Sequence, residues 1–189
     1  SDPARLLAAV RTTRDGLAAR EEGEISASEA IQLIRGRARL GAGRRVSVSG
    51  PDGTRTLTAR HVVIATGSRP RPLAIPGLPP ERTLTNENLF ELTGAPEHLA
   101  IVGAGPIGVE MACAFARLGS AVTLVDVSSR VLPQAEREAS AVLAEALADQ
   151  GIDLRLGSRV VGYDAEDLGL ELEGPRGAER VSGVDAALI

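Results

Sequence analysis

Residues 97–156 alternate between two hydrophobic patterns along the chain. Short runs of consecutive apolar residues predict buried strands, and stretches in which apolar residues recur every three or four positions predict helices. Strands and helices that alternate in this way form parallel sheets through right-handed crossovers. The predicted strands cover residues 99–103, 121–125 and 152–156, and the predicted helices cover residues 106–118 and 135–149, with Gly151 as the cap of the second helix.

The first 36 residues carry a weaker helical pattern. A sparse apolar stripe along residues 3–20 predicts a surface helix, and we expect Gly23 to end it. The order Ser26-x-x-Glu29 is typical of a capping box, which predicts a second, short helix that includes Ile31 and Ile34.

Three strands are predicted between residues 45 and 66. Residues 45–49 and 55–59 are joined by a turn at Asp52-Gly53, a dipeptide that accepts the positive φ of a tight turn. The run His61-Val62-Val63-Ile64-Ala65-Thr66 is continuously apolar after His61, which predicts a strand that is buried on both faces.

Proline-rich and late segments complete the prediction. Residues 69–80 contain five prolines and are predicted to be a linker without a helix or an interior strand. Residues 168–189 are predicted to form short antiparallel strands around Gly174-Pro175, with the last four residues resembling an interrupted strand. The chain is therefore predicted to be an α/β protein, with a Rossmann-like parallel sheet followed by an antiparallel β-meander.

Composition and charge exclude several classes of function. The net charge of −4 does not favour nucleic acid as a partner, and no apolar run reaches the roughly 20 residues of a membrane span. The polar start of the chain does not resemble a secretory signal, and the single cysteine, Cys113, has no internal disulfide partner. We therefore expect a cytoplasmic protein with no membrane partner.

The candidate chemistry lies in a G-x-G-x-x-G motif at residues 103–108. Gly103 permits a tight turn, Gly105 allows a pyrophosphate to approach the backbone, and Gly108 lets the helix pack against the sheet. Pro106 and Ile107 begin that helix, whose N–H groups and positive dipole end favour phosphate. The motif predicts a dinucleotide site because a strand precedes it and a helix follows it.

Asp126 ends the next predicted strand, at the separation of about 20 residues where an acidic residue accepts the ribose hydroxyls of adenosine. A carboxylate there would repel a 2′-phosphate, and neither Val127 nor the two serines after it adds a positive charge. Arg130 either reaches a phosphate, flanks the adenine or faces solvent. NAD(H) is therefore the predicted cofactor, with NADP the less favoured one.

Several motifs together resemble a known family. They are Ala-Thr-Gly-Ser-Arg-Pro at residues 65–70, Ile-Pro-Gly at 75–77, Ile-Val-Gly-Ala-Gly-Pro-Ile-Gly-Val-Glu at 101–110 and Arg-Val-Leu-Pro at 130–133. In this order they resemble the class I pyridine nucleotide-disulfide oxidoreductases, which include dihydrolipoamide dehydrogenase and mercuric reductase. The resemblance implies a central portion of a protein that passes hydride from NAD(P)H to FAD and then to a disulfide-type acceptor.

The resemblance also implies a domain plan and FAD-binding positions. Residues 1–78 resemble the second half of an FAD-binding domain, residues 79–96 a linker, and residues 97–189 an NAD(H)-binding domain truncated at its last strand. Arg37 and Ala38 match positions beside the FAD adenosine, whereas Thr66 and Gly67 match the segment that closes over the ribityl and phosphate groups. Glu110 matches a glutamate that pairs with a lysine near the flavin, although an exposed acid in the first helical turn is the alternative interpretation.

The chain departs from the family pattern at several points. It contains neither a first G-x-G-x-x-G motif nor a C-x₄-C disulfide, and Pro106 replaces a tyrosine that gates the nicotinamide pocket in many members. No catalytic residue and no metal ligand are predicted within the chain, and Cys113 is interpreted as a small buried thiol. These residues alone are expected to be catalytically inactive, and the full-length protein is expected to be a homodimer.

Two other functions stay open at this point. One is a flavoprotein reductase that uses NADH and passes electrons to a quinone, oxygen or a ferredoxin without a redox disulfide. The other is a non-catalytic NAD-binding module.

Overall fold

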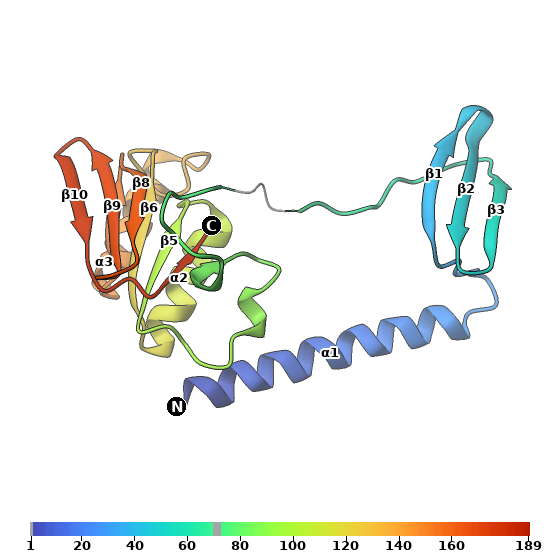
Figure 1. The fold of residues 1–189 in the computed structure, drawn as a ribbon, viewed down its shortest axis with the longest axis horizontal. Helices are drawn as coiled ribbons and strands as arrows, with labels where there is room; N and C mark the ends of the chain where they lie inside the picture. The colour runs from blue at the N-terminus through green and yellow to red at the C-terminus, as the bar shows by residue number, and fades with distance from the viewer. Residues whose placement is uncertain (1, 70–72) are drawn as a thin grey trace. The chain divides into compact units, whose positions relative to one another are not determined.

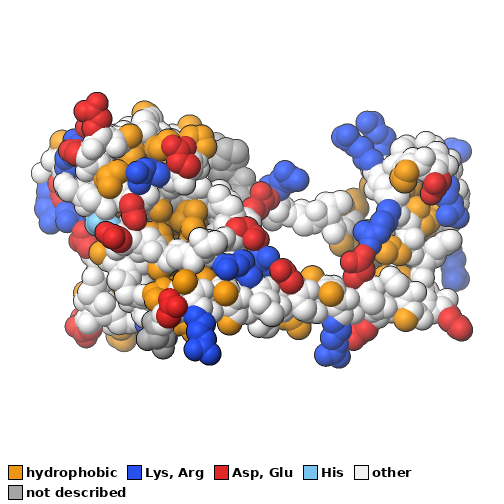
Figure 2. Space-filling model, turned by 60° about the horizontal axis from the view of Figure 1, so that its bottom comes forward, with side chains coloured by type: hydrophobic (Ala, Val, Ile, Leu, Met, Phe, Trp, Pro, Cys, Tyr) orange, Lys and Arg blue, Asp and Glu red, His pale blue; other side chains and the backbone are white. Residues whose placement is uncertain are grey.

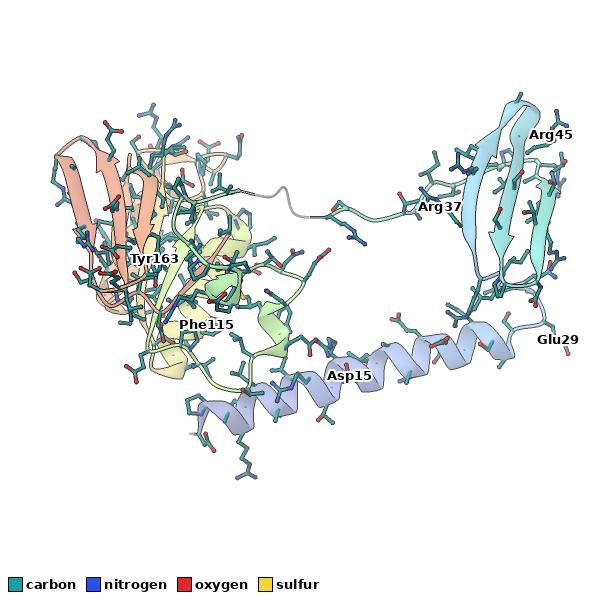
Figure 3. All side chains as sticks on the ribbon, in the orientation of Figure 1. Asp15, Glu29, Arg37, Arg45, Phe115 and Tyr163 are labelled. Carbon is teal, nitrogen blue, oxygen red and sulfur yellow. The ribbon has the colours of Figure 1, made fainter. Side chains whose placement is uncertain are left out.

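The computed structural model describes residues 2–69 and 73–189, which divide into two compact units. The larger unit contains residues 2–11 and 73–189, and the smaller one contains residues 12–69. Figure 1 shows the elements of both units, and Figure 3 adds the side chains. The first helix, α1 (Pro3–Ala27), has residues in both units.

A five-stranded parallel sheet forms the centre of the larger unit, with the strand order β4-β11-β5-β6-β7. The strands are β4 (Thr83–Leu84), β5 (His98–Val102), β6 (Ala121–Asp126), β7 (Asp153–Leu156) and β11 (Ala186–Leu188). Helix α2 (Pro106–Leu118) joins β5 to β6, and helix α3 (Arg137–Asp149) joins β6 to β7. This confirms the predicted α/β class and the alternation of strands and helices.

The two faces of the parallel sheet have different covers because neighbouring side chains of a strand point to opposite faces. Leu99 and Ile101 of β5 pack into one hydrophobic cluster with residues of α2 and α3, including Phe115. Ala100 packs into a second cluster with Tyr163 and other residues of an antiparallel sheet. That sheet has the order β10-β9-β8, formed by β8 (Arg159–Asp164), β9 (Gly169–Gly174) and β10 (Gly177–Val181).

The segment before β5 also belongs to the parallel sheet. Its elements are the 3-10 helices η2 (Pro80–Arg82) and η3 (Leu89–Glu91), with β4 between them. Leu84 and Leu89 are buried in the cluster beneath the helices. Residues 80–91 lie in the linker predicted for residues 79–96. They nevertheless contribute core side chains and an edge strand to the larger unit.

The smaller unit contains a three-stranded antiparallel sheet in the order β1-β2-β3. Its elements are β1 (Arg37–Gly41), the 3-10 helix η1 (Ala42–Arg44), β2 (Arg45–Gly50) and β3 (Gly53–Thr58). The two predicted strands and the turn at Asp52-Gly53 are confirmed, whereas β1 was not predicted. Val48 is the buried residue of β2, and every residue of β1 is exposed, including the labelled Arg37 in Figure 3.

The predicted end of the first helix and the predicted second helix are wrong. Helix α1 continues through Gly23 to Ala27, because a glycine costs only about 1 kcal/mol in a helix whose other residues favour helix formation. Ser26 lies in the last turn of α1, so it cannot cap a new helix. Residues 31–35 have no helical structure, and the Ser28 hydroxyl instead accepts a hydrogen bond from the Ala30 N–H in a local turn.

Two strand predictions are also wrong. Residues 61–66 form no strand and are exposed, with Val63 86% accessible, since no strand among residues 2–69 and 73–189 pairs with them. The final apolar segment forms β11, which lies parallel to β4 and β5 rather than antiparallel. The prolines at 70 and 72 of the predicted linker lie outside the described residues, and residues 73–79 form no helix or strand.

Candidate functional site

The glycine loop leads directly from β5 into α2. Gly103 has a φ of 116°, a value that an L side chain rarely adopts, and its N–H donates to the carbonyl oxygen of Val125 at 2.8 Å. Gly105 is the N-cap of α2 and Pro106 is its first residue. The chain therefore reverses tightly between the end of a central strand and the start of a helix.

The space around the glycines differs from one position to the next. A Cβ atom on Gly108 would overlap the carbonyl oxygen of Gly103, so this glycine is required for the close approach of helix and loop. A Cβ atom on Gly105 would meet no atom within 4 Å. The loop is thus tightly packed between Gly103 and Gly108 and open beside Gly105. The open side adjoins the first N–H groups of α2. Those groups and the helix dipole favour an anion.

Asp126 ties the glycine loop to the loop that follows β6. Its Oδ2 accepts a hydrogen bond from the Ala104 N–H, and its Oδ1 accepts one from the Ser128 N–H, both at 2.6 Å. A carboxylate has about four lone-pair positions, so each oxygen keeps one for a further donor. Asp126 consequently supports the loop and still has acceptor capacity for a ligand.

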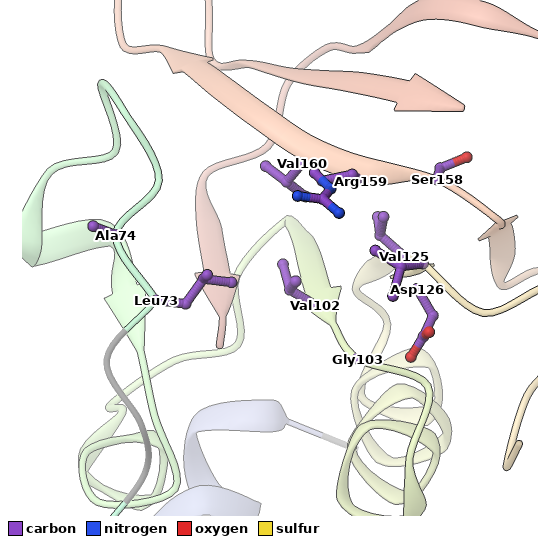
Figure 4. Close-up of a pocket in the computed structure, with 10 residues that line it drawn as sticks. Leu73, Ala74, Val102, Gly103, Val125, Asp126, Ser158, Arg159 and Val160 are labelled. Atoms are coloured by element: carbon purple, nitrogen blue, oxygen red, sulfur yellow. The ribbon is translucent and has the colours of Figure 1, made fainter. Parts of the chain in front are cut away.

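A cleft of about 440 Å³ opens over these residues (Figure 4). Its floor includes Val102, Gly103 and Asp126, and its opposite wall is formed by Arg159 and Val160 at the start of β8. Binding sites for small molecules and cofactors have volumes of about 300–1,000 Å³ and mostly apolar walls with a few polar groups. The cleft therefore has the size and lining of a ligand site.

The structure brings Gly103, Asp126 and Val127 together at this cleft. Val127 and Ile107 are largely exposed apolar side chains, at 64% and 59%, and Val127 lines the cleft. Glu110 is exposed on α2, near its start.

Arg130 has a structural partner in its own loop. Its guanidinium donates to the carbonyl oxygens of Pro133 and Ala135, at 2.6 and 3.1 Å. These bonds hold the turn between β6 and α3.

The predicted FAD-binding positions lie in the smaller unit. Ala38 is exposed on β1, and Thr66 and Gly67 are exposed in a segment without regular structure. All three positions are thus open to solvent in the described part of the chain.

The cleft residues at the start of β8 and immediately before it were not predicted from the sequence. Ser158, Arg159 and Val160 follow the third parallel strand in sequence, and no spacing rule connects them with the glycine loop. A tertiary contact brings them to the cleft, because the N–H of Ser158 donates a hydrogen bond to the carbonyl oxygen of Asp126 at 2.9 Å.

Other candidate chemistry is weak. Cys113 is half-buried and packs against the core beneath α2. Across residues 2–69 and 73–189 no group of three or more His, Cys, Asp or Glu side chains is placed to hold a metal ion.

Every helix in the described part of the chain is too short or too polar to span a membrane. On the face in Figure 2, acidic and basic side chains are interspersed over the larger unit.

Comparisons with known proteins agree with this architecture. The sequence pattern of the family described as pyridine nucleotide-disulphide oxidoreductase matches residues 7–189. The chain is 42% identical over 146 residues to dihydrolipoyl dehydrogenase 3 of Pseudomonas aeruginosa, covering 76% of this chain and 31% of the relative. It is 39% identical over 168 residues to mercuric reductase of Streptomyces lividans, covering 87% of this chain and 35% of the relative.

Solved structures show the same fold. The HOCl-induced flavoprotein disulfide reductase RclA from Escherichia coli superposes with a TM-score of 0.83 at 27% identity, over 100% of this chain and 42% of that one. The chain belongs to the pyridine nucleotide-disulphide oxidoreductase family, a flavoprotein family that uses FAD and NAD(P)H. It spans about a third of the length of the curated relatives that it matches.

Proposed function

We propose that residues 97–189 form the NAD(H)-binding portion of a FAD-dependent pyridine nucleotide-disulfide oxidoreductase, and that residues 1–78 are the second half of its FAD-binding domain. In the full-length protein, bound NADH supplies a hydride that FAD accepts and passes on to a disulfide-type acceptor. The resemblance to the family also supports a homodimer as the full-length assembly.

The observation that carries the proposal is the open space outside Gly105 beside the start of α2. A pyrophosphate fits there because no Cβ atom blocks the backbone and because the helix N-terminus favours its charge. The positive φ of Gly103 and the close contact at Gly108 fix the loop in the shape that leaves this space.

The proposed role of Asp126 is to select the nucleotide. Each of its oxygens already accepts one backbone N–H and keeps a lone pair for a ribose hydroxyl. The same carboxylate repels a 2′-phosphate, so we propose that the site prefers NADH to NADPH. Val127 and Val160 on the cleft walls offer apolar surface to the adenine ring.

Titration of the purified chain with NADH, followed by calorimetry, tests the proposal. Asp126→Ala is expected to weaken NADH binding by about tenfold or more, because a hydrogen bond to a charged group contributes about 1.5–3 kcal/mol. Gly105→Val is expected to abolish binding and to leave the circular dichroism spectrum unchanged, since its Cβ atom meets open space in the ligand-free chain.

Arg117→Gln, an exposed change in the last turn of the same helix and outside the cleft, is the matched control and is expected to bind NADH as the parent does. A folded Gly105→Val variant with normal NADH affinity would place the pyrophosphate elsewhere and would overturn the proposal.

A further inference from the structure

One positive side chain faces Asp126 across the cleft. Arg159 lies at the start of β8, and Figure 4 shows its guanidinium directed into the cleft while the Asp126 carboxylate points toward the glycine loop. Among the described residues that line the cleft, Asp126 and Arg159 are the ionisable ones, so they bring one carboxylate and one guanidinium to it.

The backbone fixes Arg159 next to the end of β6. The N–H of Gly157 donates to the carbonyl oxygen of Ser128 at 2.8 Å, and the N–H of Ser158 donates to that of Asp126 at 2.9 Å. These two bonds join the turn before β8 to the loop after β6. Arg159 therefore starts from a fixed position beside the proposed ribose site rather than from a mobile loop.

The Arg159 guanidinium has no protein partner in residues 2–69 and 73–189. The other arginines of β7 to β10 all have one: Arg155 pairs with Asp153 and Glu179, Arg176 pairs with Glu179, and Arg180 pairs with Asp164. Arg159 is thus the arginine of this region whose five N–H donors stay available to a ligand in the cleft.

We propose that Arg159 is a specificity-determining residue that binds the 2′-phosphate of NADPH and so limits the preference for NADH that Asp126 creates. This inference rests on the proposed function. A guanidinium binds phosphate through two parallel hydrogen bonds, whereas the uncharged 2′-hydroxyl of NADH offers it no such partner. Arg159 is expected to stabilise bound NADPH and to affect bound NADH little.

The experiment compares matched nucleotide pairs on the purified chain. NADH, NADPH, 5′-AMP and 2′,5′-ADP are titrated by calorimetry into the parent, Arg159→Gln and Arg159→Lys, because the last two nucleotides differ by the 2′-phosphate alone. Arg137→Gln, at the exposed start of α3 and outside the cleft, removes the same charge and serves as the control.

Arg159→Gln is expected to weaken NADPH and 2′,5′-ADP by about tenfold, the loss of one charge-assisted contact, and to change NADH and 5′-AMP by less than about threefold. Arg159→Lys should lose less than Arg159→Gln because it keeps the charge, and Arg137→Gln should bind all four nucleotides as the parent does.

Two results would overturn the inference and leave the proposed function intact. An equal loss for NADH and NADPH would mean that Arg159 contacts a group that both nucleotides share, and unchanged binding of all four would make it a solvated surface residue. A parent chain that binds none of the nucleotides would overturn the proposed function as well.

Discussion

Two segments of this chain have nearly the same pattern and different structures. Residues 61–67 read His-Val-Val-Ile-Ala-Thr-Gly, and residues 98–103 read His-Leu-Ala-Ile-Val-Gly. The second segment is β5, at the centre of the larger unit, where Leu99 is fully buried. The first segment is extended and exposed, and Val63 is 86% accessible.

The difference shows that an apolar segment forms a strand only where other strands pair with it. Strand β5 has β11 and β6 as parallel partners, with helices over one face and the antiparallel sheet over the other. Residues 61–66 have the same β-branched and apolar composition, but no strand in the described ranges hydrogen-bonds to them. Composition gives both segments the preference for a strand, and tertiary partners decide which one forms it.

Amide hydrogen exchange should give the largest contrast between the two segments. The amides of residues 61–66 make no backbone hydrogen bond in the described structure and should exchange at nearly the rate of an unfolded peptide. The amides of β5 should be protected by at least about 10³-fold, since a central strand opens with much of the global unfolding free energy. Mass spectrometry of peptides from both segments makes the measurement, and comparable protection would contradict the comparison.

Truncation of one apolar side chain in each region should give the next largest effect. Leu124 on β6 is fully buried, so Leu124→Ala should lower the free energy of unfolding of the larger unit by about 2–5 kcal/mol. Ile64 is 69% exposed, so Ile64→Ala should change the free energy of unfolding of the smaller unit, to which it belongs, by no more than about 0.5 kcal/mol. Denaturant unfolding followed by circular dichroism measures both. A loss of several kcal/mol from Ile64→Ala would show that residues 61–66 are packed.

The parts of the fold that the sequence predicts well are those with local signals at both ends. Helix α2 has the predicted bounds because Pro106 fits its first turn and Gly119, with a φ of 97°, ends it. Helix α3 begins at Arg137, two residues later than predicted, and ends at Asp149 as predicted. The strand prediction for 61–66 is wrong because it depends on partners that a hydrophobic run does not reveal.

The candidate site divides in the same way. The glycine loop and Asp126 come from one β5-α2-β6 segment, so their spacing in the sequence is enough to predict them. Arg159 and Leu73 approach the cleft from segments that are distant in sequence. Their approach depends on backbone contacts between elements, and the sequence pattern does not encode those contacts.

The segment after the proline-rich stretch is intermediate between β5, which is paired and buried, and residues 61–66, which are unpaired and exposed. Residues 75–77 have no regular structure, yet Ile75 is buried and the carbonyl oxygen of Pro76 accepts a hydrogen bond from the Tyr163 N–H at 2.8 Å. A Cβ atom on Gly77 would overlap the carbonyl oxygen of Tyr163. Strand β8 thus provides residues 75–77 with the kind of backbone contact that residues 61–66 lack.

The side chain of Tyr163 gives the smallest expected effect, which depends on pH. Its buried phenol donates a hydrogen bond to the carbonyl oxygen of Val184 at 2.7 Å, so Tyr163→Phe should cost about 1 kcal/mol at pH 7. Burial raises the pKa of Tyr163 above its ordinary value of 10.0, because the interior disfavours the tyrosinate. As the pH rises above that value, the unfolded chain ionises first, and the stability that the neutral phenol contributes is lost.

The parent should therefore lose stability more steeply than Tyr163→Phe above about pH 10, although it is the more stable of the two at pH 7. Denaturant unfolding at a series of pH values measures this difference. Because Tyr163 is the sole tyrosine of the sequence, its ultraviolet absorbance reports the titration directly in the folded and unfolded chains. A folded-state titration at the ordinary pKa, with parallel stability curves for parent and variant, would show that the phenol is solvated and does not donate to Val184.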